Sequence, residues 1–92
     1  MKYNVQHNIA EHRFEVIIDN LLSEADYVVD SRGNLKVTHT GVPRQLEGQG
    51  IAAALTKSLL DYARYNSLKV IPLCPYTAAY IRKHPEYEEL LP

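Results

Sequence analysis

Apolar residues recur at helical spacing between residues 51 and 66, and this is the longest regular pattern in the chain. The spacing i, i+4, i+8 and i+11 places one set of side chains on a single helix face, namely Ile51, Leu55, Leu59 and Tyr62. A strand-like apolar segment, Leu35–Val42, precedes this helix, and the turn between them, residues 43–50, carries two glycines. The pattern therefore predicts a strand, a glycine-bearing turn and a helix of about four turns.

The N-terminal third of the chain predicts a strand followed by a break. Residues 1–11 are polar and only weakly patterned. Apolar and polar residues alternate in Arg13–Ile18, so this segment is expected to be a strand whose inward side is formed by Phe14, Val16 and Ile18. Asp19–Glu24 interrupts the pattern, and its residues 20–22 are expected to form a loop or one helical turn.

The next two strands are predicted to form a hairpin. Ala25–Asp30 has the composition of a strand and ends at Ser31–Asn34, whose residues tolerate unusual φ angles. Leu35–Val42 is then the return strand. Because the links between these strands are short, we expect them to run antiparallel as a meander.

The residues after the helix predict a parallel strand and a short second helix. Leu68–Leu73 is short and almost continuously apolar, as expected for a strand covered on both faces. Because strand, helix and strand follow in this order, Leu35–Leu73 is expected to be a βαβ unit with a parallel pair. Pro75 suits the first position of a short helix over Tyr76–Lys83. The tail, residues 86–92, is expected to dock through Tyr87, Leu90 and Leu91.

Length and composition limit the class of protein. Ninety-two residues make one domain, residues 1–92, which these patterns place in the α/β class with a mixed sheet. The net charge of −1 gives no general attraction to nucleic acid, and no apolar run is long enough to span a membrane. The N-terminus lacks the apolar core of a signal peptide, and a single cysteine suits a reducing compartment, so we expect a cytoplasmic protein.

Two further expectations concern metals and assembly. The histidines lack zinc-type spacing, so no metal site is expected. They are His7, His12, His39 and His84. An exposed strand edge could pair with a second copy, so the protein is expected to be a monomer or a weak homodimer.

The glycine turn before the helix predicts an anion site. Gly48 is expected to adopt a positive φ or to approach a ligand closely, and Gly50 keeps the first helical turn bare. Unpaired backbone N–H groups and the helix macrodipole then favour an anion, of which phosphate is the obvious one. The turn is not a P-loop, since Ile51 and Ala52 stand where lysine and serine or threonine are needed. It also lacks the three glycines of a dinucleotide fingerprint.

The turn and its surroundings resemble the GNAT (GCN5-related) N-acetyltransferases. Residues 45–50, Gln-Leu-Glu-Gly-Gln-Gly, match the Q/R-x-x-G-x-G/A loop of that superfamily. A narrower resemblance, to the small YjdJ-type predicted acetyltransferases, rests on His39–Val42, Gly48–Ala52, Tyr62–Arg64, Cys74–Tyr76 and His84–Tyr87. The resemblance implies a truncated GNAT-like fold, because too few residues precede Ala25 for the two helices that usually help to form the acceptor site.

The same resemblance implies an acetyl-CoA-dependent N-acetyltransferase in which an amine attacks the thioester directly. The pyrophosphate would bind the backbone amides of Gly48, Gln49, Gly50 and Ile51. Gln45 would order the turn or contact a phosphate. The pantetheine arm would lie between Leu35–Val42 and Leu68–Leu73 and pair near Val42, whose N–H is the expected oxyanion donor. The acceptor is an unidentified amine. Because the acceptor helices are missing, a CoA-binding module without turnover is the alternative.

Three residues are candidates for catalysis. Cys74 lies where a strand is expected to meet a helix, and as a functional residue it would contact the thioester or accept the acetyl group. The alternative is that Cys74 is a small buried core residue without a role in the reaction. His39 is expected on the inward strand face with Val37 if alternation holds, as a core residue or as a general base. Tyr80, with Tyr76 as an alternative, matches the tyrosine that many GNAT enzymes use as general acid.

Overall fold

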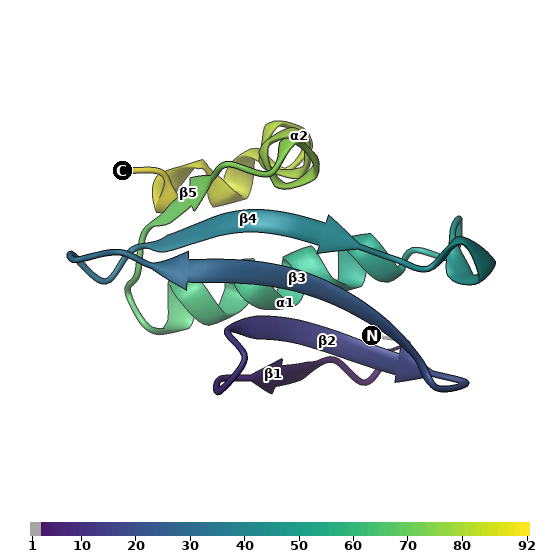
Figure 1. Cartoon of the computed structure of the whole chain (residues 1–92). Coiled ribbons are helices and arrows are strands. Elements are labelled where there is room, and N and C mark those ends of the chain that lie inside the picture. The colour runs from purple at the N-terminus through teal and green to yellow at the C-terminus, as the bar shows by residue number, and fades with distance from the viewer. Residues whose placement is uncertain (1–2) are drawn as a thin grey trace.

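The computed structural model describes residues 3–92 and shows a five-stranded mixed sheet whose strands lie in chain order (Figure 1). The strands are β1 (Gln6–Asn8), β2 (Arg13–Ile18), β3 (Leu21–Val29), β4 (Leu35–Gly41) and β5 (Val70–Pro72). The helices are α1 (Ile51–Tyr65) and α2 (Pro75–Lys83), with 3-10 turns η1 (Arg44–Leu46) and η2 (Pro85–Leu90). β1 to β4 run antiparallel and β5 pairs parallel with β4, so the predicted meander and βαβ unit are confirmed.

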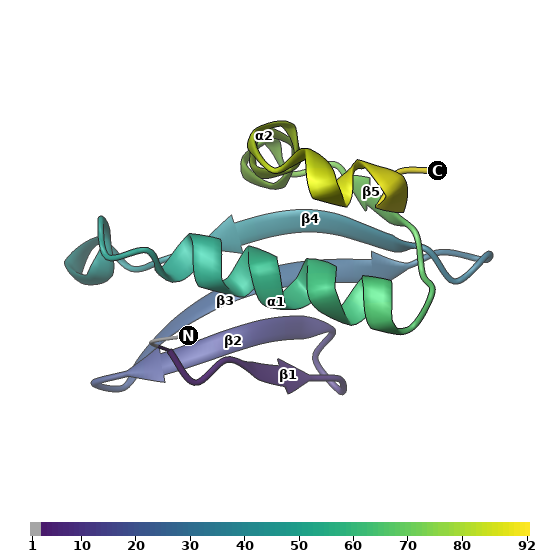
Figure 2. The ribbon, with the colours of Figure 1, turned by 180° about the vertical axis from the view of Figure 1, so that it is seen from behind.

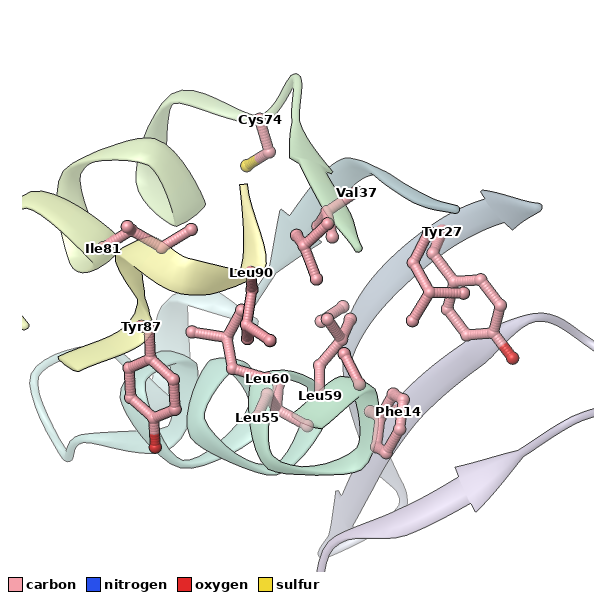
Figure 3. Packing of buried hydrophobic residues seen from close by; sticks show 14 of the residues in the cluster. Phe14, Tyr27, Val37, Leu55, Leu59, Leu60, Cys74, Ile81, Tyr87 and Leu90 are labelled. Atoms are coloured by element: carbon pink, nitrogen blue, oxygen red, sulfur yellow. The ribbon is translucent and has the colours of Figure 1, made fainter. Parts of the chain in front are cut away.

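Helix α1 crosses one face of the sheet, and its apolar side forms the centre of the core (Figure 2). The predicted helix face is confirmed, because Ile51, Leu55 and Leu59 are at most 1% exposed. Figure 3 shows Leu55, Leu59 and Leu60 of α1 near Phe14 of the sheet and Leu90 of η2. The opposite face of the sheet, toward the viewer in Figure 1, carries no helix within residues 3–92.

The connection between β2 and β3 corrects the sequence-based expectation. Asp19 and Asn20 form a two-residue hairpin turn with φ angles of 51° and 63°, a conformation that Asn and Asp tolerate better than most residues. The loop or helical turn expected at residues 20–22 is therefore wrong, and β3 begins at Leu21 rather than at Ala25. The start of the strand was not predicted because its first fully buried side chain, Ser23, is polar.

The N-terminal segment contains a strand that its polar pattern did not predict. β1 pairs antiparallel with β2 at the edge of the sheet. His7 anchors it, because the imidazole stacks on the Phe14 ring with centroids 4.1 Å apart and hydrogen-bonds the Tyr27 hydroxyl at 2.7 Å. A polar strand is held here by aromatic contacts that no local pattern reveals.

The C-terminal elements follow the prediction with one difference. β5 covers only Val70–Pro72 and lies at a sheet edge, so the expectation of a longer strand covered on both faces is wrong. Leu73, just beyond it, is 59% exposed. Pro75 occupies the start of α2 as predicted. The tail docks as predicted, since Tyr87 and Leu90 of η2 are buried.

Candidate functional site

Strands β4 and β5 pair over a short distance and then separate. Their register joins Leu35 to Val70 and ends where Val37 meets Pro72. The last backbone hydrogen bond between the two segments runs from the Cys74 N–H to the Val37 carbonyl, at 2.8 Å. Beyond it β4 continues to Gly41, while the other segment turns into α2. The end of β4 therefore presents a strand edge without a partner strand, within the described chain, where the resemblance predicted a gap.

A β-bulge in β4 decides which side chains face this gap. The register pairs Asp26 with His39 and Tyr27 with Val37, so Thr38 is an extra residue. Side chains of β4 therefore do not keep alternating between the two faces of the sheet across the bulge. His39 thus lies opposite Asp26 on the open face and is exposed, which corrects its expected place on the face of Val37. The His39 ring lies close to the end of β4, since its Nε2 is only 2.8 Å from the position that a Cβ on Gly41 would occupy.

A cleft of about 520 Å³ lies where the end of β4, the glycine turn and the start of α1 meet. Its volume is within the range of small-molecule and cofactor sites. The strand and α2 supply Thr40, Gly41, Val42 and Tyr76. The turn and helix supply Leu46, Glu47, Gly48, Gly50, Ile51, Ala52 and Ala53. Segments predicted separately thus line one cavity.

Within residues 3–92, the backbone amides at the two glycines of the turn lack hydrogen-bond acceptors. Gly48 and Gly50 both have a φ of 80°, and Gly50 is the N-cap of α1 without a side-chain cap. No acceptor within residues 3–92 is found for the N–H groups of Gly48, Gln49, Gly50 and Ile51. A Cβ on Gly48 or Gly50 would meet no heavy atom within 4 Å. Glycine is favoured by the left-handed backbone, and the space around these two glycines is open.

Cys74 is the N-cap of α2 and lies just behind the cleft wall. The residue is buried, and its Sγ lies 3.6 Å from Oγ1 of Thr40, to which it donates. Burial raises the pKa of the Cys74 thiol, but the hydrogen bonds that the thiolate accepts from the Thr77 amide, the Thr40 hydroxyl and the Tyr76 amide outweigh it, so the pKa is lowered overall. Thr40 and Tyr76 line the cleft, whereas Cys74 does not.

The remaining predicted residues lie around the cleft rather than in its wall. Gln45, in η1, is exposed. The Gln49 carbonyl accepts a hydrogen bond from the Tyr3 hydroxyl, and neither residue lines the cleft. Tyr80 stacks on His84 with ring centroids 4.0 Å apart, and burial raises the pKa of its phenol. Of the predicted cofactor-binding residues, Val42, Gly48, Gly50 and Ile51 line the cleft.

Among the wall residues that the sequence did not predict as part of the site, Thr40 and Gly41 come from the end of β4. Thr40 pairs with the buried Ala25 and reaches the inward side only because the bulge shifts the alternation. Gly41 follows it at the strand end. No local signal distinguishes them, since a bulge depends on pairing with another strand.

The described chain also lacks two kinds of feature. Within residues 3–92, no helix combines the length and the apolar character that crossing a bilayer requires. The same residues contain no group of three or more His, Cys, Asp or Glu side chains arranged to hold a metal ion.

Fold and cleft together define a GCN5-related N-acetyltransferase domain, and comparisons agree. The family described as GCN5-related N-acetyltransferase matches residues 13–90. The chain therefore belongs to this family. An NMR solution structure of a "GCN5-like putative N-acetyltransferase" from Staphylococcus aureus is 30% identical in sequence, with a TM-score of 0.75. That match covers 100% of this chain and 91% of the other. A comparison with curated protein sequences found no match.

Proposed function

We propose that this protein transfers an acetyl group from acetyl-CoA to an amine. The observation that carries the proposal is one cleft lined by both the glycine turn and the end of β4, which lacks a partner strand there within residues 3–92, in a chain of the GNAT family. Within that family we assign it to the small YjdJ-type proteins, with residues 1–92 as one domain.

The cofactor is proposed to lie along the cleft from the turn to α2. Its diphosphate accepts hydrogen bonds from the amides between Gly48 and Ile51, where the α1 macrodipole adds to the attraction. Gln45 and Gln49 flank this position. The pantetheine amides pair with the open edge of β4 at Thr40–Val42. This arrangement points the thioester toward the side of Thr40 and Tyr76.

The proposed reaction is direct attack. The amine nitrogen bonds to the acetyl carbon, the carbon–sulfur bond breaks, and the departing thiolate takes a proton. The Val42 N–H stabilises the oxyanion that forms on the carbonyl. Positioning of two reactants in one cleft supplies about 7–11 kcal/mol of the barrier, so no covalent intermediate is needed.

A tyrosine of α2 is proposed as the acid that protonates the thiolate. Tyr76 lines the cleft, and burial raises the pKa of its phenol, so it is protonated near neutral pH. Tyr80, the other candidate, is one helical turn further along and outside the cleft wall. We therefore favour Tyr76 over Tyr80 for this role.

His39 and Cys74 have different proposed roles. His39 approaches the cleft from the open face of the sheet, beside Gly41, and is placed to accept the proton that the amine loses. Cys74 is proposed to position the Thr40 side chain, which lines the cleft where the thioester is proposed to lie. A covalent acetyl-Cys74 would need the thiol to pass the Thr40 side chain, which lies between it and the cleft.

A CoA-binding protein without turnover is the second candidate. It is favoured by the tight hairpin between β2 and β3 and by the open sheet face, which leave the acceptor side without a helical wall within residues 3–92. Both candidates predict a complex with CoA, so only acetyl transfer separates them.

The test has a binding arm and a turnover arm. Calorimetric titration with acetyl-CoA is expected to show one site. Acetyl-CoA labelled in its acetyl group is then incubated with small amines, polyamines and peptides, and labelled product is expected. Tyr76→Phe is expected to lower kcat, with Tyr65→Phe as the control because Tyr65 is 89% exposed. Binding without any labelled product would favour the non-catalytic candidate, and absence of binding would refute both.

A further inference from the structure

The glycine turn is tied to the N-terminal segment of the chain. The Tyr3 hydroxyl donates a hydrogen bond of 2.6 Å to the Gln49 carbonyl, across a separation of 46 residues. Tyr3 is half-buried and packs against the hydrophobic core. Its ring also lines a separate hollow of about 310 Å³ beside the turn, together with Gln49, Lys57 and Tyr80. Tyr3 therefore contacts the turn at this second hollow and does not line the cleft.

Nothing else among the described residues restrains the Gln49 carbonyl. Helix α1 first uses the Gly50 carbonyl, which accepts from the Ala54 N–H at 3.1 Å. No backbone N–H of residues 3–92 donates to the carbonyl of Gln49. Gln49 is exposed and stands between two glycines, which are the least restricted residues in the chain. Without Tyr3, the peptide groups on either side of Gln49 would rotate more freely.

The hydrogen bond also sets the direction of the next amide. The peptide bond between Gln49 and Gly50 is trans, so the Gly50 N–H points opposite to the Gln49 carbonyl. The carbonyl points to Tyr3, which borders the second hollow and not the cleft. Gly50 borders both. The Gly50 N–H is thereby directed away from Tyr3.

We infer that Tyr3 is a positioning residue that aims the Gly50 amide at the cofactor diphosphate. The inference rests on the proposed function, since it takes acetyl-CoA as the ligand of the cleft. It adds to the GNAT loop a component from outside that loop. The amide is held in its binding direction before the ligand arrives, so less ordering is needed when the diphosphate binds.

The test compares Tyr3→Phe with Tyr65→Phe in the full chain. The Phe variant keeps the ring and removes only the hydroxyl, and Tyr65 is an exposed control. The dissociation constant is measured by calorimetry for acetyl-CoA and for acetyl-pantetheine, which lacks the diphosphate. Tyr3→Phe is expected to weaken acetyl-CoA binding by about 2- to 12-fold, the range for one hydrogen bond, and to leave acetyl-pantetheine binding unchanged. The KM for acetyl-CoA should rise by the same factor with kcat unchanged.

Other results overturn the inference in distinguishable ways. If wild-type protein binds acetyl-CoA and Tyr3→Phe binds it equally well, the positioning role is refuted while the proposed function stands. Equal weakening toward both ligands would indicate a structural role only and would also refute it. If wild-type protein binds neither ligand, the proposed function fails and the inference fails with it. Amide NMR of the free protein adds a direct readout, since the Gly50 signal should shift in Tyr3→Phe and not in Tyr65→Phe.

Discussion

Replacing Gly50 separates its part in folding from its part in ligand binding. Its φ of 80° lies in the left-handed region, which costs a residue with a β-carbon roughly 1–2 kcal/mol. A Cβ there would meet no heavy atom within 4 Å, so no steric clash adds to this cost. Alanine also lowers the conformational entropy of the unfolded chain, and this offsets roughly 0.4–1 kcal/mol of the conformational cost. Gly50→Ala is therefore expected to lower the free energy of unfolding by about 1 kcal/mol.

Asparagine supplies the matched control, because it adopts left-handed backbone far more readily than alanine. Gly50→Asn should therefore keep nearly the stability of the wild type. Both variants place a β-carbon in the open space above the turn amides, where the diphosphate is proposed to lie. Loss of one hydrogen bond to a charged group costs about 1.5–3 kcal/mol, so acetyl-CoA should bind at least about tenfold more weakly to both.

Thermal unfolding and calorimetric titration read out the two effects. For a domain of this size, 1 kcal/mol corresponds to a fall in Tm of about 4–8 °C, expected for Gly50→Ala and not for Gly50→Asn. An unchanged Tm in Gly50→Ala would contradict the left-handed conformation. Wild-type affinity for acetyl-CoA in Gly50→Asn would contradict a diphosphate at this amide, whatever the stability of the variant.

Three further predictions concern the core, the thiol and acid stability. Leu55→Ala should lower the free energy of unfolding by about 2–5 kcal/mol in denaturant titration, because Leu55 is fully buried under the sheet. Thr40→Val removes one hydrogen bond that lowers the pKa of Cys74, so the pH midpoint of thiol alkylation should rise; an unchanged midpoint would contradict the contact. Burial, and then the neighbouring His12, lower the pKa of His7 below 6.5. The unfolded chain therefore binds more protons as pH falls below about 6.5, and stability should decrease there. His7→Phe should flatten this dependence, as chemical denaturation at several pH values would reveal; an unchanged dependence would contradict the burial of His7.

The sequence alone determined the elements whose signals are local. The face of α1 follows from a period that any helix must satisfy, and it is buried as predicted. The positive φ of Gly48 follows from the absence of a β-carbon, and Pro75 at the start of α2 from its missing N–H. The order strand, helix, strand was sufficient to predict the parallel pairing of β4 with β5. The helix face, the glycine conformation and the proline position depend on residues a few positions apart, and the parallel pairing follows from the order of the elements along the chain.

Only the tertiary structure decided the features that depend on distant partners. The bulge at Thr38 arises from pairing with β3, and it moves His39 to the open face and Thr40 to the inward side. β1 is held by the contacts of His7 with aromatic rings on other elements. The Tyr3 hydroxyl reaches the Gln49 carbonyl over 46 residues. Strand register and long-range contacts are set by which surfaces can be buried together, and no local period along the chain encodes that choice.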